Sequence, residues 1–169
     1  MTRLLVLGGA RSGKSRYAQA RCEAIGGRLI YIATGQAGDD EMADRIARHR
    51  ADRGSCWETV EAPVDLAAAI AAASRRADAV LVDCLTLWLS NLMLGGHDLS
   101  EARAMLAQAV REAHVPLVLI ANEVGLGIVP DNALARRFRD EAGWLNQQIA
   151  AIADEVVLVA AGLSLPLKR

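Results

Sequence analysis

The stretch that decides the fold of this chain is Gly8-Gly9-Ala10-Arg11-Ser12-Gly13-Lys14-Ser15, which follows the apolar run of residues 4–7. It matches the pattern G-x-x-x-x-G-K-S of a phosphate-binding loop, or P-loop. In this pattern the glycines let the backbone turn its N–H groups toward phosphate oxygens, the lysine reaches the β- and γ-phosphates, and the serine hydroxyl ligates Mg²⁺. A strand before the motif and the helix-permissive residues 16–25 after it supply the context that a chance glycine-rich turn would lack. The sequence therefore predicts that this stretch binds a nucleoside triphosphate.

Composition indicates one globular domain with a small ligand. The chain has 169 residues, of which 53% are hydrophobic and 23% charged, and its formal net charge is −1. This length suits a single domain over residues 1–169, and the charge disfavours nucleic acid as a partner. The apolar runs are too short for a signal peptide or a membrane span, so we expect no membrane insertion. Cys22, Cys56 and Cys84 form no C-x-x-C pair, which is typical of reduced thiols and predicts a cytoplasmic protein.

The order of apolar and helical stretches predicts a three-layer α/β fold. Apolar runs rich in Val, Leu and Ile cover residues 4–7, 29–33, 79–82, 117–121 and 156–160. Stretches of helical character separate them, over residues 14–25, 39–53, 64–75, 100–113 and 131–153, and the last opens with Pro130-Asp131 as a start signal. Strands that are apolar on both faces form parallel sheets covered by helices. We therefore expect a mostly parallel central sheet with its ligands at the carboxyl ends of the strands.

A second candidate for the phosphate site is Asp83, which ends the apolar run of residues 79–82. A carboxylate in this position of a nucleotide-binding fold holds Mg²⁺, either directly or through water. An acidic residue after a strand is also often only a helix cap, so the P-loop in the same chain is what favours the metal role. We predict Ser15 and Asp83 as the metal-side residues. No N-K-x-D sequence is present, which disfavours a signalling GTPase and leaves the choice between guanine and adenine open.

One histidine stands among cations. On a helix, Arg45, His49 and Arg53 fall on one face. Neighbouring cations favour the neutral imidazole, whose lone pair could attack phosphorus, and they would gather polyphosphate around it. The residues alone favour the simpler interpretation of a solvated, charge-rich helix. His97 and His114 are weaker candidates for a histidine that attacks phosphorus.

The whole pattern resembles one family, the bifunctional adenosylcobinamide kinase and adenosylcobinamide-phosphate guanylyltransferase of cobalamin biosynthesis. Besides the P-loop, the segments that carry the resemblance are residues 31–34, 39–42, 45–46, 49–50, 57–63, 81–86 and 122–130. They follow one another in the expected order, and the resemblance runs nearly from end to end. It implies a P-loop NTPase domain of the RecA-like type.

The resemblance implies two reactions that use ATP or GTP with Mg²⁺. In the first, a nucleoside triphosphate phosphorylates the aminopropanol hydroxyl of adenosylcobinamide. In the second, the histidine of the R-I-x-x-H-R segment, here His49, attacks the α-phosphorus of GTP and carries GMP. The phosphate of adenosylcobinamide phosphate then displaces the histidine to give adenosylcobinamide-GDP, which is covalent catalysis. By this resemblance His49 is the catalytic nucleophile rather than part of a solvated face.

The resemblance also implies further nucleotide contacts. They are Ala33, Thr34 and Gly35 at the end of the second strand, Glu61, and the residues that follow the histidine, namely Arg50, Ala51, Asp52 and Arg53. The Glu61 carboxylate could accept hydrogen bonds from the guanine N1–H and amino groups, and the alternative is a surface acid after a short strand. Residues 122–130 would shape either the corrinoid side of the site or a subunit contact.

Two departures from the family pattern bear on the assembly. Arg48 stands where some relatives carry a second histidine, and we expect no separate corrinoid-binding domain. Because a corrin macrocycle is too large for a small one-domain pocket, the resemblance implies a homotrimer whose neighbouring subunits share the site. Two other functions stay open at this point. One is a P-loop kinase for a small alcohol in which His49 is a bystander, and the other is a nucleotide-binding regulatory switch.

Overall fold

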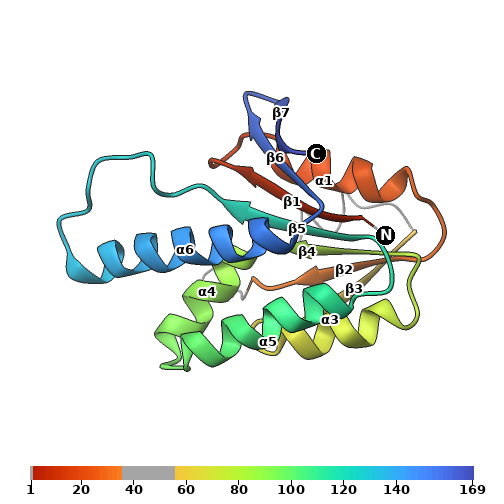
Figure 1. The fold of residues 1–169 in the computed structure, drawn as a ribbon, viewed down its shortest axis with the longest axis horizontal. Coiled ribbons are helices and arrows are strands. Elements are labelled where there is room, and N and C mark those ends of the chain that lie inside the picture. Colours follow the sequence, from red (N-terminus) through yellow and green to blue (C-terminus); the bar gives the residue numbers. More distant parts are fainter. Residues whose placement is uncertain (1, 36–55) are drawn as a thin grey trace.

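The described strands form one seven-stranded sheet in the order β3-β2-β4-β5-β1-β6-β7 (Figure 1). The structure is a computed structural model that describes residues 2–35 and 56–169, so the predicted helix over residues 39–53, with His49, lies outside it. β1 to β6 run parallel, and β7 runs antiparallel beside β6, which confirms the mostly parallel sheet. The strands are β1 (Arg3–Gly8), β2 (Leu29–Ala33), β3 (Trp57–Glu61), β4 (Ala79–Asp83), β5 (Leu117–Asn122), β6 (Glu155–Ala160) and β7 (Leu163–Lys168).

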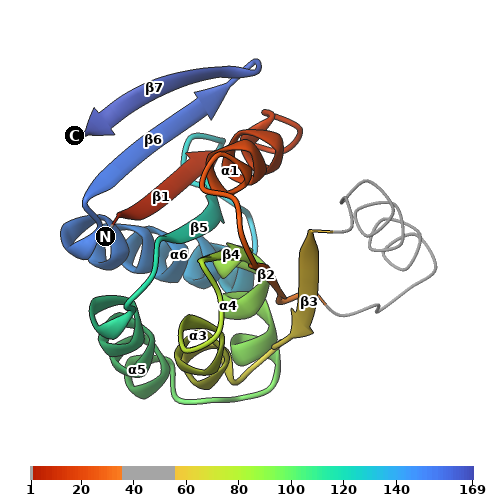
Figure 2. The same ribbon diagram turned by 90° about the vertical axis from the view of Figure 1, so that its right-hand side faces the viewer.

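The described helices cover both faces of the sheet, as Figure 2 shows. α1 (Lys14–Glu23) lies on one face, and α3 (Leu66–Ser74), α4 (Leu85–Leu94), α5 (Leu99–Glu112) and α6 (Ala133–Ile152) lie on the other. Alternate strand residues divide between the faces, because successive side chains of a strand point to opposite sides. Leu4 and Leu81 pack in the α1 layer, whereas Leu5 and Val82 pack with the other helices. This is the three-layer α/β fold that the sequence predicts.

Three elements are missing from the predicted runs: α4, β7 and β3, of which β3 appears only as the short strand before Glu61. α4 is apolar on most of its surface, with Leu85, Trp88 and Leu92 buried, so its sequence shows neither the helical nor the strand period clearly. β7 contains Pro166 and is exposed along its length, and proline within a run argues against a strand. The proline is tolerated because β7 is an edge strand, where one side of the backbone needs no partner.

The start of α6 differs from the predicted signal at Pro130-Asp131. The helix begins at Ala133, and Asn132 is its N-cap, because the Asn132 side-chain oxygen accepts a hydrogen bond from Ala135 N–H at 2.7 Å. Asp98 caps α5 in the same way. A side-chain acceptor satisfies backbone N–H groups that have no partner inside the helix, and this decides where each helix begins.

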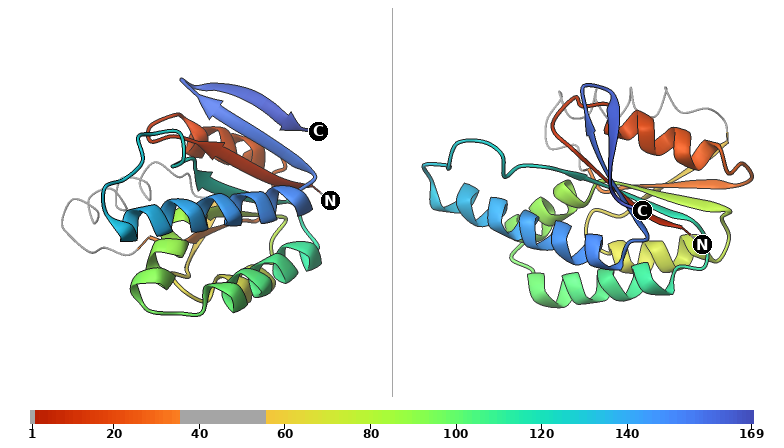
Figure 3. Two further views of the ribbon diagram at one scale, coloured as in Figure 1. Left: turned by 60° about the vertical axis from the view of Figure 1, so that its left-hand side comes forward. Right: turned by 45° about the horizontal axis from the view of Figure 1, so that its top comes forward.

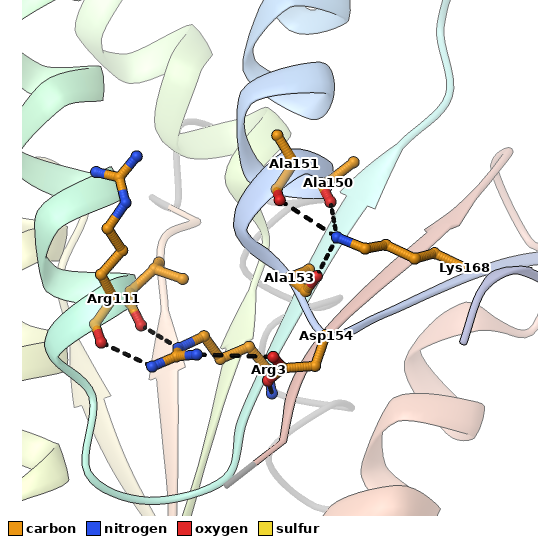
Figure 4. A network of polar contacts seen from close by, with 8 residues as sticks. Arg3, Arg111, Ala150, Ala151, Ala153, Asp154 and Lys168 are labelled. Carbon is orange, nitrogen blue, oxygen red and sulfur yellow. Dashed lines mark hydrogen bonds and ion pairs between the residues drawn. The ribbon is translucent and has the colours of Figure 1, made fainter.

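Polar contacts at the amino-end edge of the sheet join β1 to the chain segments beside it (Figure 4). The Arg3 guanidinium donates to the carbonyls of Val110 and Arg111 at 2.8 and 2.7 Å, which are at the end of α5. The Arg3 backbone N–H donates to the Asp154 carboxylate at 2.7 Å. One residue thereby ties β1 to α5 and to the segment that leads into β6.

Lys168, at the end of β7, fastens that edge strand to α6 (Figure 4). Its ammonium donates to the carbonyls of Ala150, Ala151 and Ala153 at 3.1, 3.2 and 2.5 Å. Carbonyls at the C-terminal end of a helix lack partners inside the helix, and a cation there also interacts favourably with the helix dipole.

We predict that Lys168→Met lowers the free energy of unfolding by about 1 kcal/mol, because it removes this cation and its hydrogen bonds while keeping an apolar stem. Urea unfolding of the variant beside the parent protein measures the difference. Arg169→Met is the matched control, because it removes a neighbouring exposed cation. Equal losses from the two substitutions would contradict the capping role of Lys168.

Candidate functional site

The carboxyl ends of the strands lie in register along one edge of the sheet. Across β3, β2 and β4 the aligned residues are Glu61, Ala33 and Asp83. Gly8, at the end of β1, is aligned with Asn122 of β5. In parallel sheets of this kind ligands bind outside the carboxyl ends of the strands. The P-loop follows β1 at this same edge, so it shares the edge with Asp83.

The P-loop connects β1 to α1 through a tight turn. Arg11 and Gly13 have φ angles of 54° and 95°, both in the left-handed region that glycine adopts without strain. Lys14 begins α1, and its ammonium donates to the carbonyl of Gly9 at 3.0 Å. The hydroxyl of Ser12 is buried and has no hydrogen-bond partner within residues 2–35 and 56–169. Backbone N–H groups at a helix start, a nearby ammonium and a buried hydroxyl that lacks an acceptor together suit a bound phosphate.

Ser15 and Asp83 lie within hydrogen-bond distance of each other. α1 passes over β5, so the Ser15 hydroxyl at its start reaches β4 and donates to Asp83 Oδ2 at 3.2 Å. The hydroxyl of Tyr31 donates to the same carboxylate oxygen at 2.9 Å. The structure thus brings the two predicted metal-side residues together, and their role as ligands stays a prediction. Tyr31 has no role in the sequence analysis, although a tyrosine in an apolar strand is the signal that could have found it.

Thr34 is fully buried and forms hydrogen bonds with the backbone at the end of β4. Its hydroxyl donates to the carbonyl of Cys84 at 2.7 Å and accepts from the Cys84 N–H at 2.8 Å. Its own N–H donates to the carbonyl of Asp83 at 3.1 Å. The side chain predicted as a nucleotide contact therefore holds the residues around Asp83 in place, and in this arrangement its hydroxyl is already used.

Side chains of α4 form hydrogen bonds with backbone groups at the strand ends. The Thr86 hydroxyl accepts from the Asn122 N–H at 2.7 Å, which joins α4 to the end of β5. The Asn91 amide donates to the carbonyls of Thr34 and Pro63 at 2.8 and 3.0 Å, which joins α4 to the segments after β2 and β3. Buried backbone groups at strand ends need partners, and this helix supplies them. Sequence reasoning missed Thr86 and Asn91, because nothing local shows which strand ends they reach.

The other predicted site residues fall into two groups. Gly9, Ala10 and Arg11 of the P-loop are exposed, as is Glu61 at the end of β3, while Ala33 and Gly35 are half-buried. These residues all lie at the carboxyl edge, where a nucleotide could reach them. The second group is His49, Arg50, Ala51, Asp52 and Arg53, which lie outside the described residues.

Comparison with known proteins decides the family. The sequence pattern of the family described as cobinamide kinase / cobinamide phosphate guanyltransferase matches residues 4–167. The chain belongs to this family. It is 48% identical over 166 residues to the bifunctional adenosylcobalamin biosynthesis protein CobP of Pseudomonas aeruginosa, which covers 97% of this chain and 96% of that protein. It is 43% and 44% identical to the corresponding CobU proteins of Salmonella typhimurium and Escherichia coli, over 98% of this chain and 99% of each relative.

Solved structures with a similar arrangement are more distant from this cobinamide kinase family member. The P4 protein from bacteriophage phi6 in complex with ADP has a TM-score of 0.48 and 15% identity, and the match covers 96% of this chain and 52% of that one. The RadB recombinase has a TM-score of 0.48 and 16% identity, with 92% and 73% covered. This chain spans about half the length of the phage protein. The family assignment rests on the sequence match and not on these two structures.

The cysteines of this family member are free thiols in the described structure. Burial raises the pKa of the Cys22 thiol to about 12, and Glu23 adds to the shift. Burial also raises the pKa of the Cys84 thiol to about 11, with a further contribution from Asp83. Both thiols are therefore protonated near neutral pH and are unsuited to act as nucleophiles, although Cys84 lies next to the site.

We predict that Thr34→Val lowers the free energy of unfolding by about 1–3 kcal/mol, because the buried N–H and carbonyl of Cys84 both lose their partner. Thr34→Ser is the matched control, since it keeps the hydroxyl and removes only a methyl group. Urea unfolding of both variants beside the parent measures the difference. A serine variant as unstable as the valine variant would contradict the role of the hydroxyl.

Proposed function

We propose that this chain phosphorylates adenosylcobinamide with ATP or GTP and then transfers GMP from GTP to the product, giving adenosylcobinamide-GDP and pyrophosphate. Membership of the cobinamide kinase / cobinamide phosphate guanyltransferase family supports both activities, and the names of the bifunctional relatives agree. The observation that carries the proposal is the P-loop at the end of β1 with Ser15 beside Asp83. Both reactions begin from a nucleoside triphosphate, which this arrangement suits.

The phosphate end of the nucleotide would lie on the P-loop. Backbone N–H groups around Gly13 would hold the phosphate oxygens, and Lys14 would reach the β- and γ-phosphates. The Ser15 hydroxyl and the Asp83 carboxylate are oxygen ligands, 3.2 Å apart, of the kind that Mg²⁺ prefers. Two protein ligands suit a Mg²⁺ ion that completes its coordination shell with phosphate oxygens and water. Among the described residues, no group of three or more His, Cys, Asp or Glu side chains could hold a metal by itself. When bound, Mg²⁺ supplies positive charge against the phosphate oxygens.

The guanylyl transfer is proposed to pass through His49. Its neutral imidazole nitrogen attacks the α-phosphorus of GTP, the bond to the bridging oxygen breaks, and pyrophosphate leaves. A phosphate oxygen of adenosylcobinamide phosphate then attacks the same phosphorus, and the P–N bond breaks to release the imidazole. Arg50 and Arg53 would offset the charge that develops on the phosphoryl oxygens. The family match supports these roles. Residues 36–55 lie outside the described structure, so no contact of His49, Arg50 or Arg53 adds to that support.

The base and ribose would lie along the edge from β2 to β3. Ala33 and Glu61 are aligned across these strands, and Gly35 follows Ala33 by two residues. The Glu61 carboxylate is exposed there, and it could accept hydrogen bonds from the guanine N1–H and amino groups. Ala51 and Asp52 are proposed to complete the nucleotide contacts. Thr34 would contribute indirectly, through its hydrogen bonds to Cys84.

We propose further that the protein is a cytoplasmic homotrimer of one-domain subunits. Leu126, Ile128 and Val129 are 87%, 98% and 63% exposed in the segment between β5 and α6, which extends away from the sheet (Figure 1). Exposed apolar side chains of this kind favour contact with another subunit. None of the helices in the described ranges has the length and hydropathy that crossing a membrane requires. Sedimentation of the protein tests the assembly, and a monomer would contradict it.

The mass of the intact protein after incubation with GTP and Mg²⁺ tests the covalent route. We expect an acid-labile increase equal to one GMP per chain, because the phosphoramidate forms without the corrinoid. His49→Ala should abolish the adduct. His97→Ala is the matched control, since His97 is exposed in a glycine loop and should leave the adduct unchanged.

Two results would contradict the covalent route. An adduct that persists in the His49→Ala variant would place the nucleophile elsewhere. A parent protein that binds GTP but forms no adduct would favour a simple P-loop kinase, in which only the γ-phosphoryl group moves.

A further inference from the structure

The turn between β6 and β7 has a backbone conformation that few residues adopt. Ala160 and Leu163 are the last paired residues, so Ala161 and Gly162 make a two-residue hairpin turn. Their φ angles are 53° and 77°. Positive φ at both positions is what a type I′ turn requires, and this turn matches the twist of the two strands. In such a turn the N–H of the second residue has no partner within the hairpin, so it is available to a neighbour.

That neighbour is the P-loop. The Gly162 N–H donates to the carbonyl of Ser12 at 2.8 Å. The two glycines lie close together, because a Cβ built on Gly13 would lie only 3.2 Å from the Gly162 Cα. In both views of Figure 3 the end of the hairpin lies beside the loop that leads from β1 into α1. Two segments from opposite ends of the sequence thus meet at the phosphate site.

The hydrogen bond fixes the orientation of one peptide group. The Ser12 carbonyl and the Gly13 N–H belong to the same trans peptide, so they point in opposite directions. Because the carbonyl points toward the hairpin turn, the Gly13 N–H points away from it. No described residue accepts a hydrogen bond from this N–H. A P-loop uses such N–H groups to hold phosphate.

We propose that Gly162 is a positioning residue for the phosphate site. It holds the Ser12–Gly13 peptide with its N–H available to a phosphate oxygen and its carbonyl turned away from the anion. Without this bond the peptide is free to rotate and to present the carbonyl oxygen, which repels phosphate. The inference rests on nucleotide binding at the P-loop, as proposed above.

The hairpin turn is suited to this role because β6, the strand that leads into it, is paired with β1, the strand that leads into the P-loop. Lys168 joins the far end of β7 to α6. β7 itself adds little to the core, since Leu163 and Leu165 are 76% and 57% exposed. The contact of its turn with Ser12 is the feature that connects it to the site.

Two substitutions at Gly162 test the proposal. Valine is strongly disfavoured at positive φ, whereas asparagine tolerates it, so both add a Cβ but only valine should displace the turn. The added Cβ would lie 3.6 Å from the Arg16 guanidinium, which is ordinary contact. We expect Gly162→Val to raise the Kd for GTP with Mg²⁺ at least tenfold, and Gly162→Asn to stay within threefold of the parent. Lys168→Met, which loosens the far end of the same hairpin, should leave the Kd within twofold.

The proposal is overturned if folded Gly162→Val binds GTP like the parent, or if Lys168→Met loses affinity by the same factor. Lys14→Ala distinguishes failure of nucleotide binding at the P-loop from failure of the role of Gly162. A parent protein that does not bind GTP, or that binds it equally without Lys14, would contradict the proposed function itself. If Lys14→Ala loses affinity for GTP, as expected, but Gly162→Val binds GTP like the parent, only the role of Gly162 is contradicted.

Amide hydrogen exchange of the parent protein keeps the test open if the valine variant does not fold. The Gly162 amide should be protected before nucleotide is added, because it is already bonded to Ser12. The Gly13 amide should become protected only when GTP and Mg²⁺ bind. Rapid exchange at Gly162, or an unchanged Gly13 amide in the GTP-bound protein, would overturn the proposal.

Discussion

The absence of a side chain at Gly8 is the constraint on which the rest of the site depends. A Cβ there would lie 2.5 Å from the Ser12 hydroxyl oxygen and 2.6 Å from the carbonyl oxygen of Val159, so it would collide on both sides. Glycine lets the chain turn back directly at the end of β1 while β6 pairs closely beside it. α1 can then begin at Lys14 and place Ser15 within reach of Asp83.

The site divides into a binding loop and a buried frame. The P-loop offers N–H groups and a cation, and these require accurate orientation more than burial. The frame consists of hydrogen bonds that hold strand ends: Thr34 on both sides of the Cys84 residue, Thr86 on Asn122, and Asn91 on the segment after β2. Asp83 stands where the two parts meet. Its carboxylate accepts from Ser15 of the loop and from Tyr31 of β2, so an ion bound at Asp83 would lie at the junction of the loop and the sheet.

Features of the fold and the site that have a local cause can be predicted from the sequence. The P-loop, the five apolar strands and Asp83 can be predicted, because glycine spacing, apolar runs and a carboxylate after a strand each occupy a few neighbouring residues. The roles of Thr34 and Gly162 could not be predicted, since each depends on a partner that the fold brings from far along the chain. α4 was missed because its apolar residues do not follow one period. The family resemblance adds His49, whose surroundings lie outside the described residues.

The central claim is that the triphosphate and its metal ion lie at the carboxyl edge of the sheet, between the P-loop and Asp83. A crystal structure with Mn²⁺ and a non-hydrolysable GTP analogue tests it most directly, because the anomalous signal of the metal locates the ion independently. We expect phosphate oxygens on the P-loop amides, and a metal that contacts Ser15 and Asp83 directly or through one water. A triphosphate bound elsewhere, or a metal remote from both residues, would contradict it.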